Sequence, residues 1–152
     1  MLTSNLEANV PKVTGDKAYS ARLKGMTGPE MVREIGAELF AGGQDIEIEA
    51  ELSITTGSVS GKNHVVSLPG EPPNSNTHVL DLNIETVQVA PLKVEVSSNA
   101  PYAADLEYGT SKMAERPYMR PAVAKRRRDV TLRIRNAVNR VIRRSKSQAQ
   151  GA

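Results

Sequence analysis

The stretch IETVQVAPLKVEVSS, residues 84–98, decides the fold class of this chain. Within it, two runs of alternating side chains, 84–90 and 92–96, flank the pair Ala90–Pro91. Alternation with a period of two is typical of β-strands, because successive side chains of a strand point to opposite faces of a sheet. The stretch therefore predicts a β-hairpin over residues 84–98 with a turn near Ala90–Pro91.

The segment before the hairpin predicts a long amphipathic helix. Thr27 and Glu30 have the spacing of a capping box, and Pro29 suits the first turn of a helix. Apolar residues then recur every three or four positions, which is the helical period. Gly42–Gly43 would ordinarily end a helix, and the alternation after them also fits a strand. Because the helical spacing continues past the glycines, we predict one helix to about Thr55.

Shorter elements surround these two. We predict a flexible arm over residues 1–14 and a short helix over 16–26. Residues 65–77 contain three prolines, which predicts a stiff connection without regular structure before the hairpin. Residues 100–109 predict a second short helix that ends at its glycine.

The last part of the chain predicts a long basic helix from Pro121 to about Arg144, roughly 36 Å long, followed by a disordered polar tail over 145–152. Apolar side chains recur with helical spacing at Val123, Val130, Ile134, Ala137, Val138 and Val141. The chain is therefore predicted to form a single α+β domain over residues 15–144. Its small antiparallel β-sheet, the hairpin 84–98, would pack with a long N-terminal helix and a long basic C-terminal helix.

Charge is distributed unevenly along the 152 residues, although the net charge is only +3. Residues 1–115 carry 16 acidic and 8 basic side chains, whereas residues 116–152 carry 12 basic side chains and one acid. Such asymmetry indicates a charged partner or self-association between the two halves. Aromatic residues make up 3% of the chain, which predicts a small aliphatic core that a partner chain completes.

Residue types that carry catalysis or bind metals are sparse. The chain has no cysteine, and its two histidines, His64 and His78, lie in loop-like segments without an acidic cluster at metal-ligand spacing. The tripeptide SGK at 60–62 lacks the glycine spacing and the following Ser or Thr of a phosphate-binding loop. No run approaches about 18 apolar residues. We therefore expect no enzyme activity, no metal or cofactor and no membrane partner.

Arginines recur along one side of the predicted C-terminal helix, at Arg126, Arg133, Arg140 and Arg144. Guanidinium groups pair with carboxylates and with phosphates. We favour contacts with the acidic segment 34–51 of a neighbouring subunit. Contact with the phosphate backbone of DNA is one alternative, and plain solvation is another. The helix has no aromatic or base-reading side chains, which argues against the specific recognition of nucleic acid.

A second stretch, YAADLEYGTSKMAERPYMRPA at residues 102–122, connects the last two predicted helices. Arg116–Pro117 and Arg120–Pro121 each place an arginine before a proline, which favours an extended backbone at the arginine. An ion pair between Glu107 and one of these arginines would pin the connection. The residues themselves thus predict a rigid bracket and no catalysis.

This second stretch resembles a motif of the neck or tail-completion proteins of tailed bacteriophages, Tyr-Ala…Glu-x-Gly-Thr…Arg-Pro-x-(Leu/Met)-Arg-Pro-Ala. The segment LPGEPPNSNTHVL at residues 68–80 resembles an earlier Pro-Gly-Glu-Pro-Pro segment of that family, with His78 where the family usually has glycine. The two segments come in the family's order with the hairpin between them. The resemblance implies that the structural signature residues are Glu107, Gly109, Thr110, Arg116, Pro117, Arg120 and Pro121.

For function, the resemblance implies a structural virion protein that is assembled in the host cytoplasm and forms a ring of six copies at the neck. Its partners would be further copies of itself, head-closure or connector proteins, and tail-terminator or tail-tube proteins, with packaged DNA passing nearby. The alternative is a basic DNA-binding accessory protein that contacts the phosphate backbone through its C-terminal helix.

Overall fold

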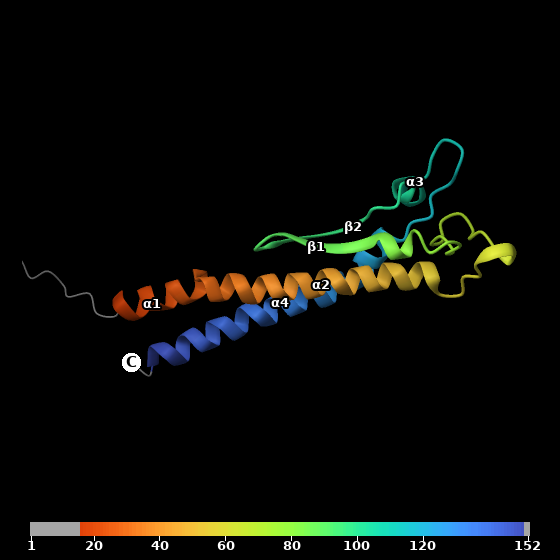
Figure 1. The fold of residues 1–152 in the computed structure, drawn as a ribbon. Coiled ribbons are helices and arrows are strands. Elements are labelled where there is room, and N and C mark those ends of the chain that lie inside the picture. The colour runs from red at the N-terminus through yellow and green to blue at the C-terminus, as the bar shows by residue number, and fades with distance from the viewer. Residues whose placement is uncertain (1–15, 151–152) are drawn as a thin grey trace, which may run out of the picture.

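Long antiparallel helices form the body of the protein (Figure 1). A computed structural model describes residues 16–150. Helices α1 (Asp16–Thr27) and α2 (Pro29–Thr55) follow one another nearly in line, and α4 (Met119–Gln150) runs back along them. The C-terminal end of α4 therefore lies beside α1, while its first turns lie near the end of α2.

The start of α2 differs from the prediction in one respect. Gly28, with extended backbone, precedes the helix without any side-chain cap, and Pro29 occupies the first turn as expected. The hydroxyl of Thr27 donates to the carbonyl of Leu23 at 2.9 Å. The predicted capping box is wrong, because Thr27 is the last residue of α1 and its hydroxyl bonds backward into that helix.

Gly42–Gly43 lie inside α2 and do not end it, so the prediction of one helix to Thr55 is confirmed. Both glycines face a packed element. A Cβ atom on Gly42 would lie 2.8 Å from Cγ1 of Val130 in α4, and one on Gly43 would lie 2.7 Å from Cγ2 of Thr86 in the hairpin. The missing side chains let α4 and the hairpin approach α2 closely from two sides.

The predicted hairpin is also confirmed. Strands β1 (Ile84–Ala90) and β2 (Lys93–Ser98) form a two-stranded antiparallel sheet. Thr86, Val94 and Val96 approach the glycine at position 43 of α2. The sheet is thus a thin layer on α2, and the whole is an α+β fold.

The hydrophobic core lies at the end of the molecule where α2 stops and α4 starts. The irregular connection 56–83 closes over this end, together with the short helix α3 (Ala103–Tyr108). The buried cluster consists of Ala50, Ile54, Leu80, Ile84, Ala100, Ala103, Tyr118 and Ala122. It is small and mainly aliphatic, in line with the composition.

The C-terminal helix is longer than predicted. It begins at Met119, two residues before Pro121, and ends at Gln150 instead of near Arg144. The prediction of a disordered tail is therefore wrong for residues 145–150. Ser145 is buried and packs against Gly25 of α1. A Cβ atom on Gly25 would lie 2.7 Å from the Cβ atom of Ser145. The predicted arm, 1–14, lies outside the described residues.

Candidate functional site

The connection between α3 and α4 is organised around one buried carboxylate, that of Glu107, which is 5% exposed. It accepts hydrogen bonds from the backbone N–H groups of Tyr118, Met119 and Arg120, each at 2.9 Å. Tyr118 precedes α4, and Met119 and Arg120 are its first residues, so their backbone N–H groups have no partner within the helix. Glu107 thus caps α4 from a different helix, and its negative charge suits the positive end of the helix dipole.

Arg120 adds a second set of bonds to the same carboxylate. Its Nε donates to Oε1 of Glu107 at 3.0 Å, and its Nη2 donates both to the carbonyl oxygen of Glu107 and to Oε2 of Glu115, each at 2.7 Å. The guanidinium carbon lies 5.4 Å from the centre of the Tyr108 ring. Arg120 is therefore the arginine that pins the connection, as the sequence predicted for one of the two.

Burial raises the pKa of Glu107, but the hydrogen bonds it accepts have the larger combined effect. The backbone N–H groups of Tyr118, Met119 and Arg120, followed by the Arg120 guanidinium, bring the pKa below its ordinary value. The carboxylate is therefore ionised at neutral pH. A group in this state holds the fold and does not act as a general acid.

Gly109 has a backbone conformation that is essentially restricted to glycine, with φ 73° and ψ 177°. A Cβ atom there would lie 2.8 Å from the backbone nitrogen of Glu115 and from the carbonyl oxygen of Met113. The neighbouring Thr110 donates its N–H to that same carbonyl at 2.8 Å. The chain from 109 to 115 is thereby folded back on itself.

Arg116 connects this loop to the proline-rich segment. Its N–H donates to the carbonyl of Leu106 at 2.7 Å, and its Nε donates to the carbonyl of Ser67 at 3.2 Å. The N–H of Gly70 donates to the carbonyl of Glu115 at 2.9 Å. The two segments that carry the family resemblance, far apart in sequence, are therefore in direct contact.

Both signature prolines have a clear place. Pro117 is half-buried in the extended stretch between Arg116 and Tyr118, and Pro121 is in the first turn of α4. The first turn of a helix tolerates proline because its missing N–H would have no helical partner there. We call residues 107–121, with the bonds described above, the α3–α4 bracket.

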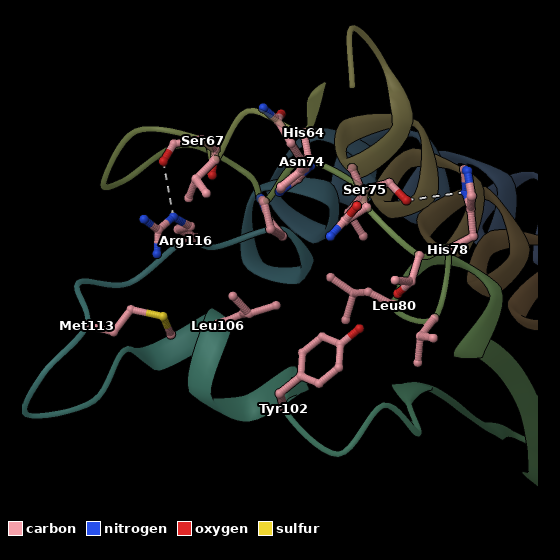
Figure 2. A pocket seen from close by; sticks show the side chains of 16 residues that line it. His64, Ser67, Asn74, Ser75, His78, Leu80, Tyr102, Leu106, Met113 and Arg116 are labelled. Atoms are coloured by element: carbon pink, nitrogen blue, oxygen red, sulfur yellow. Dashed lines mark hydrogen bonds between the residues drawn. The ribbon is translucent and has the colours of Figure 1, made fainter. Parts of the chain in front are cut away.

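A cavity of about 240 Å³ lies between the bracket, the end of α2 and the proline-rich segment (Figure 2). Apolar side chains, among them Ile54, Leu80 and Leu106, form much of its lining. Figure 2 shows Arg116 and His78 on different sides of this cavity. The cavity adjoins the core.

His78 belongs to a small polar network beside the cavity. Its Nδ1 lies 2.9 Å from Oδ2 of Asp81, and the hydroxyl of Ser75 donates to Oδ1 of Asp81 at 3.0 Å. Burial raises the pKa of Asp81, but the hydrogen bonds from His78, the backbone and Ser75 outweigh it and lower the pKa overall. Sequence reasoning missed this network, whose one local signal is an acid three residues after a histidine.

Ser60 completes a Ser–His–Asp sequence of contacts, but its geometry is unfavourable for catalysis. Its Oγ lies 3.5 Å from Nε2 of His78, and the hydroxyl donates instead to the carbonyl of Ser75 at 3.3 Å. The N–H of Gly61 is bonded to Asn76 at 3.1 Å. These contacts tie the 56–83 connection together. Within residues 16–150, no group of three or more His, Cys, Asp or Glu side chains is placed to hold a metal ion.

Acidification should destabilise the protein, because the buried carboxylates of Asp81 and Glu107 both have lowered pKa values. The stability they contribute is fully present above their unfolded pKa of about 4 and is lost as the pH falls through the lower folded pKa. We expect the melting temperature to fall below about pH 4. Between pH 6 and pH 3, the melting temperature of the Asp81→Asn variant should fall by less than that of the natural protein. Parallel losses in the two proteins would contradict this assignment.

The four predicted arginines of α4 do pair with acids, but with acids of the same chain. α2 and α4 are antiparallel, so the partners run in opposite order along the two helices. The ion pairs are Arg126–Glu49 at 2.6 Å, Arg133–Asp45 at 2.9 Å, Arg140–Glu38 at 2.6 Å and Arg144–Glu34 at 2.8 Å. The prediction of a neighbouring subunit as the partner is therefore wrong for these arginines. We call them the inner arginines.

Electrostatics along this helix pair are mutually favourable. Hydrogen bonding to Arg144, and to a lesser extent to Arg140, lowers the pKa of Glu34. Lys125 and Arg126 likewise lower the pKa of Glu49. The inner arginines are thus largely neutralised within the chain.

A second set of arginines on α4 stays exposed. Arg127, Arg128, Arg135 and Arg143 make no ion pair with any residue in the range 16–150. The first three line a shallow groove of about 530 Å³ on the outside of α4. After the inner pairs cancel, this outer face carries the excess positive charge of the helix.

Comparison of the chain with protein-family models, with curated proteins and with solved structures gave no match. Of the helices between residues 16 and 150, none combines the length and apolar character needed to cross a membrane.

Proposed function

We propose that the protein is a structural component of a tailed-phage virion that forms a ring at the neck and joins the head connector to the tail. The observation that carries the proposal is the α3–α4 bracket. The residues that resemble the family motif are those whose atoms hold this bracket together, above all Glu107, Gly109 and Arg120. Their roles are structural, as expected for a motif of an assembly protein.

The conformation of His78 gives further support. It is the non-glycine residue with a positive φ, 58°, among the described residues. Glycine is the residue that adopts this conformation most readily, and glycine is what the resembled family usually has at this position. The local backbone thus fits the family's pattern even though the side chain differs.

The proposed partners are further copies of the chain, the head-closure or connector proteins, and the tail-terminator or tail-tube proteins. The proposed location is the virion neck, after assembly in the host cytoplasm. The small core and the strongly charged exposed helix suit a protein whose surfaces are covered by assembly.

Deletion of the gene from a phage that encodes this protein should leave DNA-filled heads and separate tails, visible by electron microscopy. Supplying the natural protein in the host should restore joined particles, and so should Glu115→Ala, which removes one exposed ion pair. Glu107→Ala should fail to restore them. Infectious particles at normal yield from the deletion strain would overturn the proposal.

A basic DNA-binding accessory protein is the second candidate, favoured by the unpaired arginines of the outer α4 face. Binding of this kind would be independent of sequence and would weaken steeply with salt. Titration of the purified protein with random-sequence duplex DNA at two salt concentrations tests it. Binding by monomers with a clear salt dependence would favour this candidate over the neck protein.

A further inference from the structure

We propose that the outside of α4 binds a second copy of this chain, and that its partner surface is the exposed flank of α2. The outer α4 face consists of Ala124, Arg127, Arg128, Thr131, Leu132 and Arg135. The α2 flank consists of Glu47, Ile48, Glu51 and Leu52. The inference rests on the proposed ring and identifies which surfaces of the subunit form it.

Charge complementarity is the first argument. The inner arginines use the acids on the side of α2 that faces α4, which leaves Arg128 and Arg135 without a carboxylate in the described chain. Glu47 and Glu51 on the α2 flank are likewise without an ion pair among residues 16–150. One chain thus presents unpaired cations on one surface and unpaired anions on another.

The environment of Glu51 shows that this flank lacks a cation. Burial raises its pKa, and the nearby carboxylates of Glu47 and Asp81 raise it further. An arginine from another copy would relieve this repulsion. The guanidinium group of that arginine could also form two parallel hydrogen bonds with the Glu51 carboxylate.

Exposed apolar side chains on both surfaces give an independent argument. Leu132 is 51% exposed on the α4 face, while Ile48 and Leu52 are 50% and 49% exposed on the α2 flank. The α2 flank thus places two exposed apolar side chains beside two acids, and the α4 face places Leu132 beside three arginines. A phosphate backbone offers nothing apolar to cover them, so a protein partner is favoured over DNA.

The proposed contact is head-to-tail, because it joins two different surfaces of identical chains. Such heterologous contacts generate rings when their rotation closes. Each α4 would then lie between its own α2 and the α2 of the next copy. The same arginine–carboxylate chemistry would be used on both sides of the helix.

Cysteine cross-linking tests the contact, since the chain has no cysteine of its own. Ile48→Cys and Leu132→Cys are prepared as separate proteins, mixed and oxidised, and the disulfide-linked heterodimer is quantified by mass spectrometry. Val87→Cys replaces Ile48→Cys in the control, because Val87 is also exposed but lies on the hairpin. The 48–132 heterodimer should exceed the 87–132 control clearly. Equal yields would overturn the proposal.

Charge reversal makes the test specific. Adding Arg128→Glu and Arg135→Glu to the Leu132→Cys protein should lower the heterodimer yield about tenfold, because attraction becomes repulsion. Adding Glu47→Arg and Glu51→Arg to the Ile48→Cys protein should then restore it. An unchanged yield after the first reversal would overturn the proposal, as would failure of the second to restore it.

Competing occupants give different results in the same experiment. If random-sequence duplex DNA binds and this binding is lost on Arg128→Glu with Arg135→Glu, while no 48–132 heterodimer forms, phosphate is the occupant and the proposal is wrong. Failure of the cross-link would not affect the neck assignment, which the deletion phenotype tests separately. Conversely, a specific cross-link would stand even if the deletion strain stayed infectious.

Discussion

Replacing Glu107 with alanine is expected to lower the free energy of unfolding by about 3–5 kcal/mol. The change removes a buried carboxylate that accepts three backbone N–H groups and the Nε of Arg120. It leaves the first turn of α4 without its cap, and Glu115 remains as the one carboxylate that pairs with Arg120 in the described chain. Urea denaturation followed by circular dichroism measures the effect, with the midpoint and the slope analysed separately.

Glu115→Ala is the matched control for this substitution. It also removes a carboxylate that contacts Arg120, but this side chain is about half exposed, so the loss should stay below about 1 kcal/mol. Glu107→Gln should be less damaging than alanine, because an amide oxygen still accepts hydrogen bonds. Similar losses for Glu107→Ala and Glu115→Ala would show that the bracket does not depend on the buried carboxylate.

Gly109→Ala is expected to have the second largest effect. The backbone conformation of Gly109 costs about 1–3 kcal/mol of stability for a residue with a side chain. The overlap of the new methyl group with backbone atoms of Met113 and Glu115, at 2.8 Å, adds a penalty of similar size. Because the obstructing atoms are backbone, a side-chain rotation cannot relieve the overlap. Thermal unfolding of the purified variant gives the measurement.

Gly57→Ala separates the two causes. Gly57 also has a positive φ, 76°, but a Cβ atom there would meet nothing within 4 Å. This variant should show the cost of a positive φ without a steric overlap, and so a smaller loss than Gly109→Ala. If both variants were equally stable, the close packing around Gly109 would have no energetic consequence.

Much of the fold could be predicted because its strongest signals are periodic. The hairpin and α2 each repeat their apolar pattern over many residues, and both were placed within a residue or two. The errors lie at helix ends, where contacts between elements decide. Thr27 has capping chemistry, yet the preceding helix uses its hydroxyl, and Ser145 is held in α4 by packing against α1.

The α3–α4 bracket could be predicted only in part. Two Arg-Pro pairs and one acid suggested an ion pair, and Arg120 makes it with Glu107. The three hydrogen bonds that Glu107 accepts from backbone N–H groups could not be predicted, because every residue other than proline has such a group and the sequence does not show which ones a carboxylate will contact. The contact of Arg116 with Ser67 spans 49 positions and has no local signal.

The inner arginines show a different limit. A seven-residue spacing places Arg126, Arg133 and Arg140 on one side of a helix, and the acids of α2 were correctly expected as partners. Spacing does not tell whether two complementary helices belong to one chain or to two. That choice depends on whether the segment between α2 and α4 folds so that the two helices lie antiparallel within one chain. The pattern of either helix alone does not contain this information.

The position of the core at one end of the helix pair makes the stability of the molecule uneven along its length. Around Ile54 and Tyr118 the helices are fixed by the main buried cluster. About 30 Å away, by the helical rise, Ala137 and Val141 are buried as well, but the arginines of the ion pairs made by Arg140 and Arg144 are about half exposed. Salt screens exposed pairs much more than buried contacts. Ionic strength should therefore change the stability of the far end of α4 more than that of the core end. The two ends of the helix pair thus differ in how they are held, one mainly by apolar contacts and the other partly by ion pairs, so a change of salt concentration acts on them unequally.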